Sequence, residues 1–500
     1  MNVLLKIVSF FSVVIILLTF SDCKKDKLTL NVADKIQFSQ DSVLFDTVFT
    51  TLGSATKNIR IRNKNSQRIK ISSIELQGGN SSSFIINVDG AKGTSFSDIE
   101  IAANDSIYVF IQVNVNPTNV NTPMIISDAI HVFVNGNKQT LPLEAWGQDA
   151  YYHFAKEAIK LKDGRYLTYS YVDTLKNSYT ANGKVFTWKN DKPHVIYGYL
   201  VVDSLQKFII PEGTKVFLNA LAGIWVLPGG EIQVLGKKGN EVTFQGVRRE
   251  KDYADEPGQW DRIWINEGSD NNVINYAIIK NGFIGVQAEV LGNTIGGAGR
   301  LKITNTRIQN MSMWGLYALA YKIDGGNNII SNCQEYSLNI LLGGEYSFYH
   351  CTFSNFWEKD KPREKPAINI NNYTTQQVLP NIVYFGNCIV DGKRDNEINL
   401  DLKTTKDTNS VQFIRFSNCW LKTSISTSDT NRFYNVRVSN NPLKYKDLAN
   451  YKFETETGET RIKGFDNLQA KNDAKVYIRD IEGVVRNTGT PITIGPYYIP

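Results

Sequence analysis

Between about residues 195 and 425, short apolar runs alternate with Gly and Asn, and one short phrase recurs. It consists of one or two apolar or Ser/Thr residues, then Asn or His, then Cys or Thr. Copies lie at residues 303–306, 330–333, 348–351, 385–388 and 416–419, with a looser copy at 273–276. Irregularly spaced units that each carry a short β-rich run are typical of a solenoid, because one unit buries its apolar side only against the next. The repeat therefore predicts stacked coils of short parallel strands.

The polar position of the phrase predicts how each coil turns. Asn side chains at turns can form hydrogen-bonded ladders that satisfy the bent backbone. We therefore interpret Asn305, Asn332, Asn387 and Asn418 as turn residues and not as ligands. His350 takes the Asn position of its copy and is interpreted in the same way.

Four cysteines, Cys333, Cys351, Cys388 and Cys419, take the last position of the phrase, and we expect them in one slot of the coil. Strands stacked about 4.8 Å apart would bring them within bridging distance, which favours disulfides in an exported protein. Alternatively, the thiols form an internal ladder, since free Cys packs like a small hydrophobe. The ladder is our favoured interpretation, and both remain open. No Cys-x-x-Cys pair is present and the chain has four His, so no zinc site is expected.

Residues 31–150 show period-2 alternation instead, for example at residues 58–62 and 107–115. Turn signals separate about seven short strands, and Asn135-Gly136 is typical of a two-residue hairpin. This spacing predicts a β-sandwich. Phrases such as Phe45-Asp46-Thr47-Val48 resemble the immunoglobulin-like modules of bacterial surface proteins, which implies a spacer or adhesion module. Residues 151–193 are aromatic, charged and irregular, and we expect a connector there.

The N-terminus differs from both regions. Lys6 precedes an apolar run at residues 7–20 that is short for a membrane span of about 20 residues, so residues 1–22 are expected to be a signal peptide. Cys23 and a polar segment follow, an arrangement that resembles a bacterial lipoprotein signal, although Asp22 stands where a small residue is usual. The resemblance implies lipid attachment at Cys23 and a place in the cell envelope, at the outer membrane or surface of a Gram-negative bacterium. A plain signal peptide followed by an incidental Cys is the alternative.

The second region resembles the right-handed parallel β-helix family, also called pectin-lyase-like. Residues 208–216 and 230–236 look like its opening coils, and residues 480–483 and 494–498 look like the closing segment of exported members. The expected fold is all-β, with an N-terminal immunoglobulin-like β-sandwich followed by a right-handed parallel β-helix over residues 194–500 that ends in a cap. The family includes lyases, hydrolases, adhesins and proteins without known activity, so this fold does not choose a function.

The net charge of the chain indicates which classes of binding partner to expect. The formal net charge of +6 is spread along the chain without a dense Lys/Arg run. Nucleic-acid binding needs a concentrated basic face, so we expect no nucleic-acid partner. A mild basic excess is compatible with a polysaccharide.

One acidic loop is the first candidate site. Lyases of the resembled family use a Lys or Arg base and acidic residues that hold calcium, whereas its hydrolases use two or three close carboxylates. A loop of carboxylates, an arginine and an aromatic residue could bind a sugar acid or calcium; alternatively, ion pairs simply hold the loop in place. Calcium is expected only if the protein is a lyase, and no other cofactor is expected. The loop residues are Asp252, Asp255, Glu256, Trp260, Asp261 and Arg262.

Aromatic residues are the second candidate site. Trp314, Tyr346 and Trp357 would form a platform for sugar rings if they were exposed on one face, and would fill the interior if buried. We expect a surface-anchored scaffold or glycan-binding protein. The alternative is a polysaccharide lyase or glycoside hydrolase acting on an acidic polysaccharide, and no catalytic residue is assigned.

Overall fold

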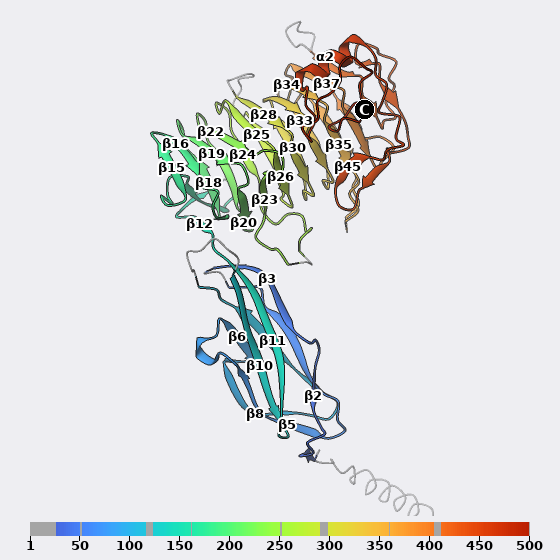
Figure 1. The fold of residues 1–500 in the computed structure, drawn as a ribbon. Coiled ribbons are helices and arrows are strands. Elements are labelled where there is room, and N and C mark those ends of the chain that lie inside the picture. The colour runs from blue at the N-terminus through green and yellow to red at the C-terminus, as the bar shows by residue number, and fades with distance from the viewer. Residues whose placement is uncertain are drawn as a thin grey trace, which may run out of the picture. The chain divides into compact units, whose positions relative to one another are not determined.

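The computed structural model describes residues 27–50, 53–116, 124–161, 163–250, 253–290, 299–359, 361–404 and 412–499. Residues 1–22, Cys23 and Asp252 of the predictions above lie outside this set. The chain divides into two compact units, residues 1–149 and 150–500. Nearly all regular structure is β, and the expected fold class is confirmed: a β-sandwich is followed by a parallel β-helix (Figure 1).

The first unit is a sandwich of two sheets. One has the order β1-β5-β10-β11-β3 with β8 on β5, and the other has the order β2-β4-β9-β6-β7. Inward side chains of both sheets, such as Ile61, Ile86 and Val132, are fully buried in one core. The hairpin between β10 and β11 turns at Asn135-Gly136, where both residues have positive φ, as predicted. The strands are β1 (Leu28–Thr29), β2 (Ile36–Phe38), β3 (Val43–Phe49), β4 (Lys57–Asn63), β5 (Arg68–Leu76), β6 (Phe84–Val88), β7 (Ala91–Gly93), β8 (Ser95–Ile101), β9 (Ser106–Val113), β10 (Met124–Val134) and β11 (Asn137–Gln148).

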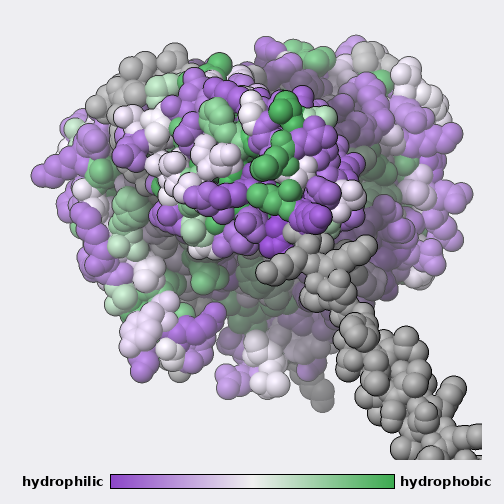
Figure 2. Space-filling model, turned by 90° about the horizontal axis from the view of Figure 1, so that it is seen from below, coloured by the Kyte–Doolittle hydropathy of each residue, from purple (hydrophilic) through white to green (hydrophobic). Residues whose placement is uncertain are grey.

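Apolar side chains are exposed where the described chain begins. Leu28, Leu30 and Val32 expose 38%, 78% and 62% of their surface. Figure 2, which views the molecule from below, shows hydrophobic atoms at the surface surrounded by hydrophilic ones. These side chains are therefore available for an apolar contact close to the N-terminus.

The second unit is a solenoid of three long sheets, to which most coils contribute one strand each. Sheet 1 consists of β13 (Glu157–Lys160), β14 (Tyr166–Tyr171), β18 (Tyr199–Val202), β21 (Gly223–Val226), β24 (Ile263–Ile265), β27 (Ile284–Glu289), β30 (Trp314–Leu319), β33 (Leu338–Leu341), β36 (Ile368–Asn371) and β39 (Ile398–Asp401). Sheet 2 consists of β15 (Tyr179–Asn182), β16 (Val185–Trp188), β19 (Lys207–Pro211), β22 (Glu231–Leu235), β25 (Asn272–Asn275), β28 (Arg300–Thr304), β31 (Lys322–Gly326), β34 (Gly344–Tyr349), β37 (Asn381–Gly386), β40 (Gln412–Ser417) and β42 (Phe433–Tyr434). Sheet 3 consists of β12 (Tyr151–Phe154), β17 (His194–Tyr197), β20 (Lys215–Leu218), β23 (Val242–Gly246), β26 (Ala277–Lys280), β29 (Arg307–Gln309), β32 (Ile329–Ser331), β35 (Thr352–Asn355), β38 (Ile389–Gly392), β41 (Trp420–Leu421) and β43 (Arg437–Val438).

The segment 151–193, expected to be a connector, supplies β12 to β16 and thus the first strands of all three sheets. Within it β12 pairs in parallel with β17, and β16 pairs in parallel with β19. The alternation in β16 buries Phe186 and Trp188 in the solenoid core. Burial of these large rings is the physical reason why the segment forms a coil.

The turns from sheet 2 to sheet 3 show the predicted ladder. Asn305 donates from Nδ2 to Asn275 Oδ1 at 2.9 Å, and Asn327 donates to Asn305 Oδ1 at 3.0 Å. Asn and His tolerate the left-handed conformation better than most residues. This accounts for the residue types in the sequence phrase. The left-handed position is held by Tyr276, Asn305, Asn327, His350, Asn387, Asn418 and Asn435, with φ from 46° to 54°.

Asn332 and Cys333 belong to a different turn, from sheet 3 to sheet 1. Ile329 in β32 lies opposite Thr352 in β35, so Cys333 is out of register with Cys351. The expectation of one shared slot is therefore wrong for Cys333. Sequence similarity between two kinds of turn in the same coil caused the error.

The other three cysteines do stack. The backbone N–H of Cys351 contacts Sγ of Cys388 at 3.4 Å, and the N–H of Cys388 contacts Sγ of Cys419 at 3.4 Å. All four thiols, including Cys333, are free and fully buried. The structure thus has the thiol ladder and not the disulfide alternative.

The C-terminal segment closes the solenoid and then runs back along its turns. It contains β44 (Tyr445–Asp447), β45 (Lys452–Thr455) and α2 (Leu468–Val476). Asn387 donates to the carbonyl of Ala470 at 2.9 Å, and Asn327 donates to the carbonyl of Arg479 at 2.8 Å, so the segment moves towards earlier coils. No helix among the described residues is long and apolar enough to cross a membrane.

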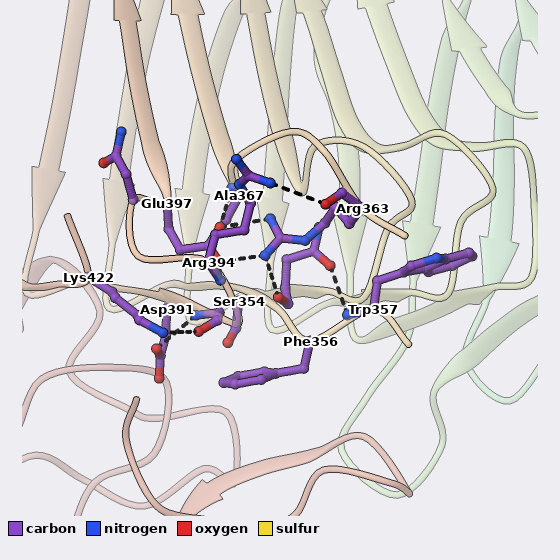
Figure 3. Close-up of polar contacts among 12 residues, drawn as sticks. Ser354, Phe356, Trp357, Arg363, Ala367, Asp391, Arg394, Glu397 and Lys422 are labelled. Carbon is purple, nitrogen blue, oxygen red and sulfur yellow. Dashed lines mark hydrogen bonds and ion pairs between the residues drawn. The ribbon is translucent and has the colours of Figure 1, made fainter. Parts of the chain in front are cut away.

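Buried charged groups hold the cap and one long loop on the solenoid (Figure 3). Asp391 Oδ2 accepts hydrogen bonds from the backbone N–H of Leu443 and the hydroxyl of Tyr445, both at 2.9 Å. Burial raises the pKa of Asp391 to about 7. Arg363 donates to both carboxylate oxygens of Glu397, at 2.8 and 2.5 Å. Since every one of these groups is engaged inside the protein, we assign them a structural role.

Candidate functional site

Long connections adjoin sheet 1. Residues 253–262 lead into β24, residues 361–367 lead into β36, and residues 372–380 follow β36. In contrast, the turns from sheet 2 to sheet 3 in the same region are one or two residues long, as at residues 305–306. Binding residues are found disproportionately on and beside loops carried by a rigid scaffold. The outer face of sheet 1 is therefore the candidate site.

A row of aromatic side chains crosses this face. In β21 and β24 a half-buried Trp stands between two fully buried aliphatic residues, so Trp225 and Trp264 point outward. The register places Trp225 opposite Trp264, Trp264 opposite Gln287, and Gln287 opposite Tyr317. The two indole rings stack with centroids 4.9 Å apart and an interplanar angle of 9°. Parallel pairing of two strands of similar pattern thus stacks Trp225 on Trp264, and Gln287 separates this aromatic strip from Tyr317.

Amide side chains continue the same row. Tyr317 lies opposite Asn339, which lies opposite Asn369 and then Asn399. Asn369 donates to Asn339 Oδ1 at 2.8 Å, and Asn399 donates to Asn369 Oδ1 at 2.7 Å. The outer row therefore changes along the solenoid from aromatic rings to neutral hydrogen-bonding groups.

Glu289 lies beside the aromatic strip and is 4% exposed. Its Oε1 accepts from Trp264 Nε1 at 2.5 Å, and its Oε2 accepts from Gln287 Nε2 at 2.8 Å. Burial raises the pKa of Glu289, against the opposing effects of these two hydrogen bonds and of the positive charge of Arg262. A buried carboxyl group that is easier to protonate than usual is a feature of many functional sites.

A second carboxylate joins the network through Arg262. Arg262 donates from Nε to Asp261 Oδ1 at 2.8 Å and from Nη1 to the side-chain oxygen of Gln287. The hydroxyl of Tyr199 donates to the other oxygen of Asp261, and burial raises the pKa of Tyr199. A chain of hydrogen bonds thus runs from Tyr199 to Glu289. Both carboxylates have a protein donor on each oxygen, so the arrangement favours positioning and binding over a free catalytic base.

The structure separates the six residues of the acidic loop. Asp261 and Arg262 lie on the sheet 1 face, whereas Asp255 and Glu256 are exposed farther along the loop. Trp260 is 1% exposed and donates from Nε1 to the carbonyl of Lys280 at 2.8 Å. Trp260 is therefore a core residue, and Asp252 lies outside the described residues.

The predicted aromatic platform is separated as well. Trp314 is half-buried beside the sheet 1 face, with its ring 4.7 Å from that of Tyr317 and its Nε1 donating to Glu335 at 2.7 Å. Tyr346 is 1% exposed inside the solenoid, where its hydroxyl donates to the carbonyl of Gly343 at 2.9 Å. Tyr346 is therefore a core residue and not part of an exposed platform.

Trp357 lies at another place, in the wall of a cavity of about 420 Å³. Asn332 and Tyr451 also line this cavity. Lys359, another lining residue, donates to the carbonyl of Asp255 at 2.7 Å and so brings the acidic loop against it. The cavity has an aromatic wall and polar groups. Among its described lining residues, no carboxylate takes part in a hydrogen-bond network like that of Glu289.

Calcium does not fit the sheet 1 face. Calcium takes six to eight oxygen ligands. All four carboxylate oxygens of Asp261 and Glu289 already accept hydrogen bonds from protein donors. Across the described part of the chain, no group of three or more His, Cys, Asp or Glu is arranged to hold a metal ion.

Sequence reasoning did not assign Tyr199, Trp225, Gln287 and Glu289 to a site. A signal for the tryptophans was present, because Ile224-Trp225-Val226 and Ile263-Trp264-Ile265 have the same alternation. Two strands of equal pattern in successive coils place their central residues side by side. Gln287 and Glu289 could be found only by counting outward positions from Val286 and Ala288.

Comparisons with known proteins give limited information. No family model matches the chain, and no curated protein matches it. Similar solved structures include a PapD-like domain of human CEP192, with 12% identity, a TM-score of 0.17, and coverage of 24% of this chain and 89% of that one. A family 123 glycoside hydrolase from Clostridium perfringens has 12% identity, a TM-score of 0.16, and coverage of 22% and 26%. The E. coli chaperone DraB has 6% identity, a TM-score of 0.17, and coverage of 25% and 56%. Such TM-scores carry no functional argument for this chain.

Proposed function

We propose that the solenoid binds a glycan on the outer face of sheet 1. The supporting observation is the outward row of Trp225, Trp264 and Tyr317, in register with a row of amides. Sugar rings present apolar faces that stack on aromatic rings, and their hydroxyl groups pair with amide and carboxylate groups. Trp225 and Trp264 supply half-buried rings on adjacent strands, and Asn399 is the exposed amide of the row, whereas Asn339 and Asn369 are buried beneath the surface.

A panel of immobilised polysaccharides tests this proposal. We expect one or more glycans to retain the protein without formation of new reducing or unsaturated ends. The double variant Trp225→Ala/Trp264→Ala should lose retention, whereas Trp146→Ala, which removes a 47% exposed Trp of the sandwich, should keep it. Retention by no glycan, or equal retention of all three proteins, would refute the proposal.

A second candidate function is glycan cleavage, and Glu289 favours it. A carboxyl group with a raised pKa can serve as general acid, and glycoside hydrolases need a second carboxylate, for which Asp261 is the candidate. Cleavage predicts new reducing ends in the panel, and a lyase reaction predicts unsaturated ends. Glu289→Gln should then abolish product while retention persists. Product formation by this variant at the wild-type rate would exclude the assignment.

We further propose that the chain is an exported envelope lipoprotein of the pectin-lyase-like class, anchored through Cys23, with the immunoglobulin-like sandwich as a spacer in sequence between anchor and solenoid. The exposed Leu28, Leu30 and Val32 support this, since they follow Cys23 closely and suit the vicinity of a membrane. Cys23→Ala should release the protein from membranes. Unchanged membrane retention of this variant would contradict lipid attachment there.

A further inference from the structure

We infer that the cavity of about 420 Å³ beside Trp357 binds a single sugar residue. Its volume is within the range of about 300 to 1,000 Å³ that is usual for small-molecule pockets, and it far exceeds the roughly 30 Å³ of one water molecule. None of the described residues that line it belongs to the sheet 1 row. The cavity is therefore a separate site, and its assignment does not rest on glycan binding at sheet 1.

Two segments far apart in the sequence form the walls of the cavity. Phe356 and Trp357 follow β35 at neighbouring positions (Figure 3), and residues 448–451 connect β44 to β45 in the cap. The ring of Phe356 lies 5.8 Å from that of Tyr445 in the cap. Trp357 Nε1 donates to the carbonyl of Lys361 at 2.9 Å. Contacts within the protein thus hold the aromatic wall in place independently of a ligand.

Three hydrogen-bonding groups at the cavity have no protein partner among the described residues. Asn310 is 1% exposed, and its Nδ2 has two acceptors, but its Oδ1 accepts from no described donor. Asn332 Oδ1 accepts from the N–H of Phe356 at 3.0 Å, which leaves its Nδ2 without a described acceptor. The hydroxyl of Tyr451 makes no hydrogen bond within the described chain either. Since buried polar groups are nearly always hydrogen-bonded, these three groups indicate a polar occupant.

Tyr451 is held in an unusual backbone conformation. Its φ is 57°, in the left-handed region that bulky side chains rarely adopt. Asp447 fixes the loop, because its two oxygens accept from the backbone N–H and the side-chain Nδ2 of Asn450, at 3.1 and 2.9 Å. Strained residues of this kind occur preferentially at ligand sites. Burial raises the pKa of Tyr451, so its hydroxyl stays protonated at neutral pH and can donate to a ligand.

A sugar residue matches both the aromatic wall and the polar groups. The apolar faces of its ring can pack on Trp357 and Tyr451, and its hydroxyl groups each donate and accept hydrogen bonds. These hydroxyl groups can therefore pair with the acceptor Oδ1 of Asn310, the donor Nδ2 of Asn332 and the hydroxyl of Tyr451. An apolar ligand would leave the three groups unpaired, which costs free energy in a buried place. A small ion would make no use of the aromatic wall.

Titration of the full chain with free sugars, followed by ligand-observed NMR, tests the inference. The probes are glucose, galactose, mannose, xylose, N-acetylglucosamine and galacturonic acid, with adenosine as a ligand of another class. We expect at least one of the sugars to bind. Binding of no sugar, or of adenosine alone, overturns the inference.

Two matched variants assign the binding to the cavity. Tyr451→Phe removes only the hydroxyl that has no described partner, and it should weaken binding about fivefold, since one hydrogen bond to the sugar is lost. Its unfolding midpoint should stay unchanged or rise, because no protein hydrogen bond is broken. A lower midpoint would mean that the hydroxyl has a structural role and would contradict the inference. Tyr108→Phe, at a 40% exposed Tyr of the sandwich, should change neither the affinity nor the midpoint.

The same titrations in the Trp225→Ala/Trp264→Ala background separate the two proposed sites. Sugar binding that persists in this background and is weakened by Tyr451→Phe supports the cavity, whatever the outcome for sheet 1. Sugar binding that is lost in this background and is unaffected by Tyr451→Phe would place the sugar on sheet 1 and overturn the inference.

Discussion

Asp391 gives a quantitative prediction about the attachment of the C-terminal cap. It is fully buried on β38 (Figure 3), and its Oδ2 accepts hydrogen bonds from the N–H of Leu443 and the hydroxyl of Tyr445 in the cap. Burial raises its pKa from 3.8 to about 7, against the opposing effects of these hydrogen bonds and of Lys422. The folded state therefore favours the protonated carboxyl group. The stabilisation is complete below pH 3.8 and is lost as the pH rises through about 7.

The magnitude follows from the two pKa values. Each pKa unit corresponds to about 1.4 kcal/mol, so ionisation inside the fold costs about 4 kcal/mol in full. By proton linkage, about 3 kcal/mol of this cost develops as the pH rises from 5 to 8. Asp391→Asn cannot ionise and avoids this cost. The difference in cap stability between the Asn variant and the wild type should therefore shift by about 3 kcal/mol in favour of Asn from pH 5 to pH 8.

Hydrogen exchange of the amides around Leu443 and Tyr445 in the full chain measures this shift. Comparing variant and wild type at each pH cancels the intrinsic pH dependence of exchange. Asp270→Asn, at an exposed position of the same unit, serves as the control and should show no shift. The same stability difference at pH 5 and pH 8 for Asp391→Asn would refute the reasoning, because it would mean that the carboxyl group ionises as easily as in the unfolded chain.

Three further predictions test the ladder, the thiols and the site. Asn305 has a φ of 52°, so Asn305→Ala should be less stable than Asn305→Gly by about 1 kcal/mol in urea unfolding, and the reverse order would contradict a left-handed turn. Burial raises the pKa of Cys333 to about 12 and that of Cys388 well above its ordinary value. Neither thiol should therefore react with iodoacetamide at pH 8 until the chain unfolds. Rapid labelling detected by mass spectrometry would contradict their burial. Trp264 donates a hydrogen bond to Glu289, whose pKa is raised above 4.5. Tryptophan fluorescence should therefore change with pH in a step whose midpoint lies above 4.5, and this step should vanish in Glu289→Gln. A step that persists in the variant would contradict its assignment to Glu289.

The solenoid could be predicted from sequence because its turns need particular residue types. Asn at a left-handed position is visible in the sequence wherever it recurs, as at Asn387 and Asn418. The phrase does not say which of two corners it occupies, which is why Asn332 is a left-handed turn residue as predicted but Cys333 does not share the slot of the other three cysteines. The strand register between coils decides which corner a copy of the phrase occupies, and this register depends on loop lengths that vary from coil to coil.

The site was harder to predict because its residues come from different coils. Asp255 and Asp261 belong to one acidic stretch, yet only Asp261 is fixed on the face, since β24 begins two residues later at Ile263. Trp264 and Glu289 are neighbours only after β24 and β27 pair. Aromatic content alone cannot distinguish such a residue from Tyr346, which fills the interior.

Titration calorimetry with a retained glycan tests the central claim most directly. Wild type, Trp264→Ala and Trp146→Ala are compared at equal concentration, with circular dichroism to show that the solenoid is intact. Loss of one stacking ring from the sheet 1 face should weaken binding about tenfold, since an aromatic contact contributes on the order of 1 kcal/mol beyond its buried area. Loss of the exposed Trp146 should change nothing. Equal affinities for Trp264→Ala and the wild type would contradict the assignment of glycan binding to this face.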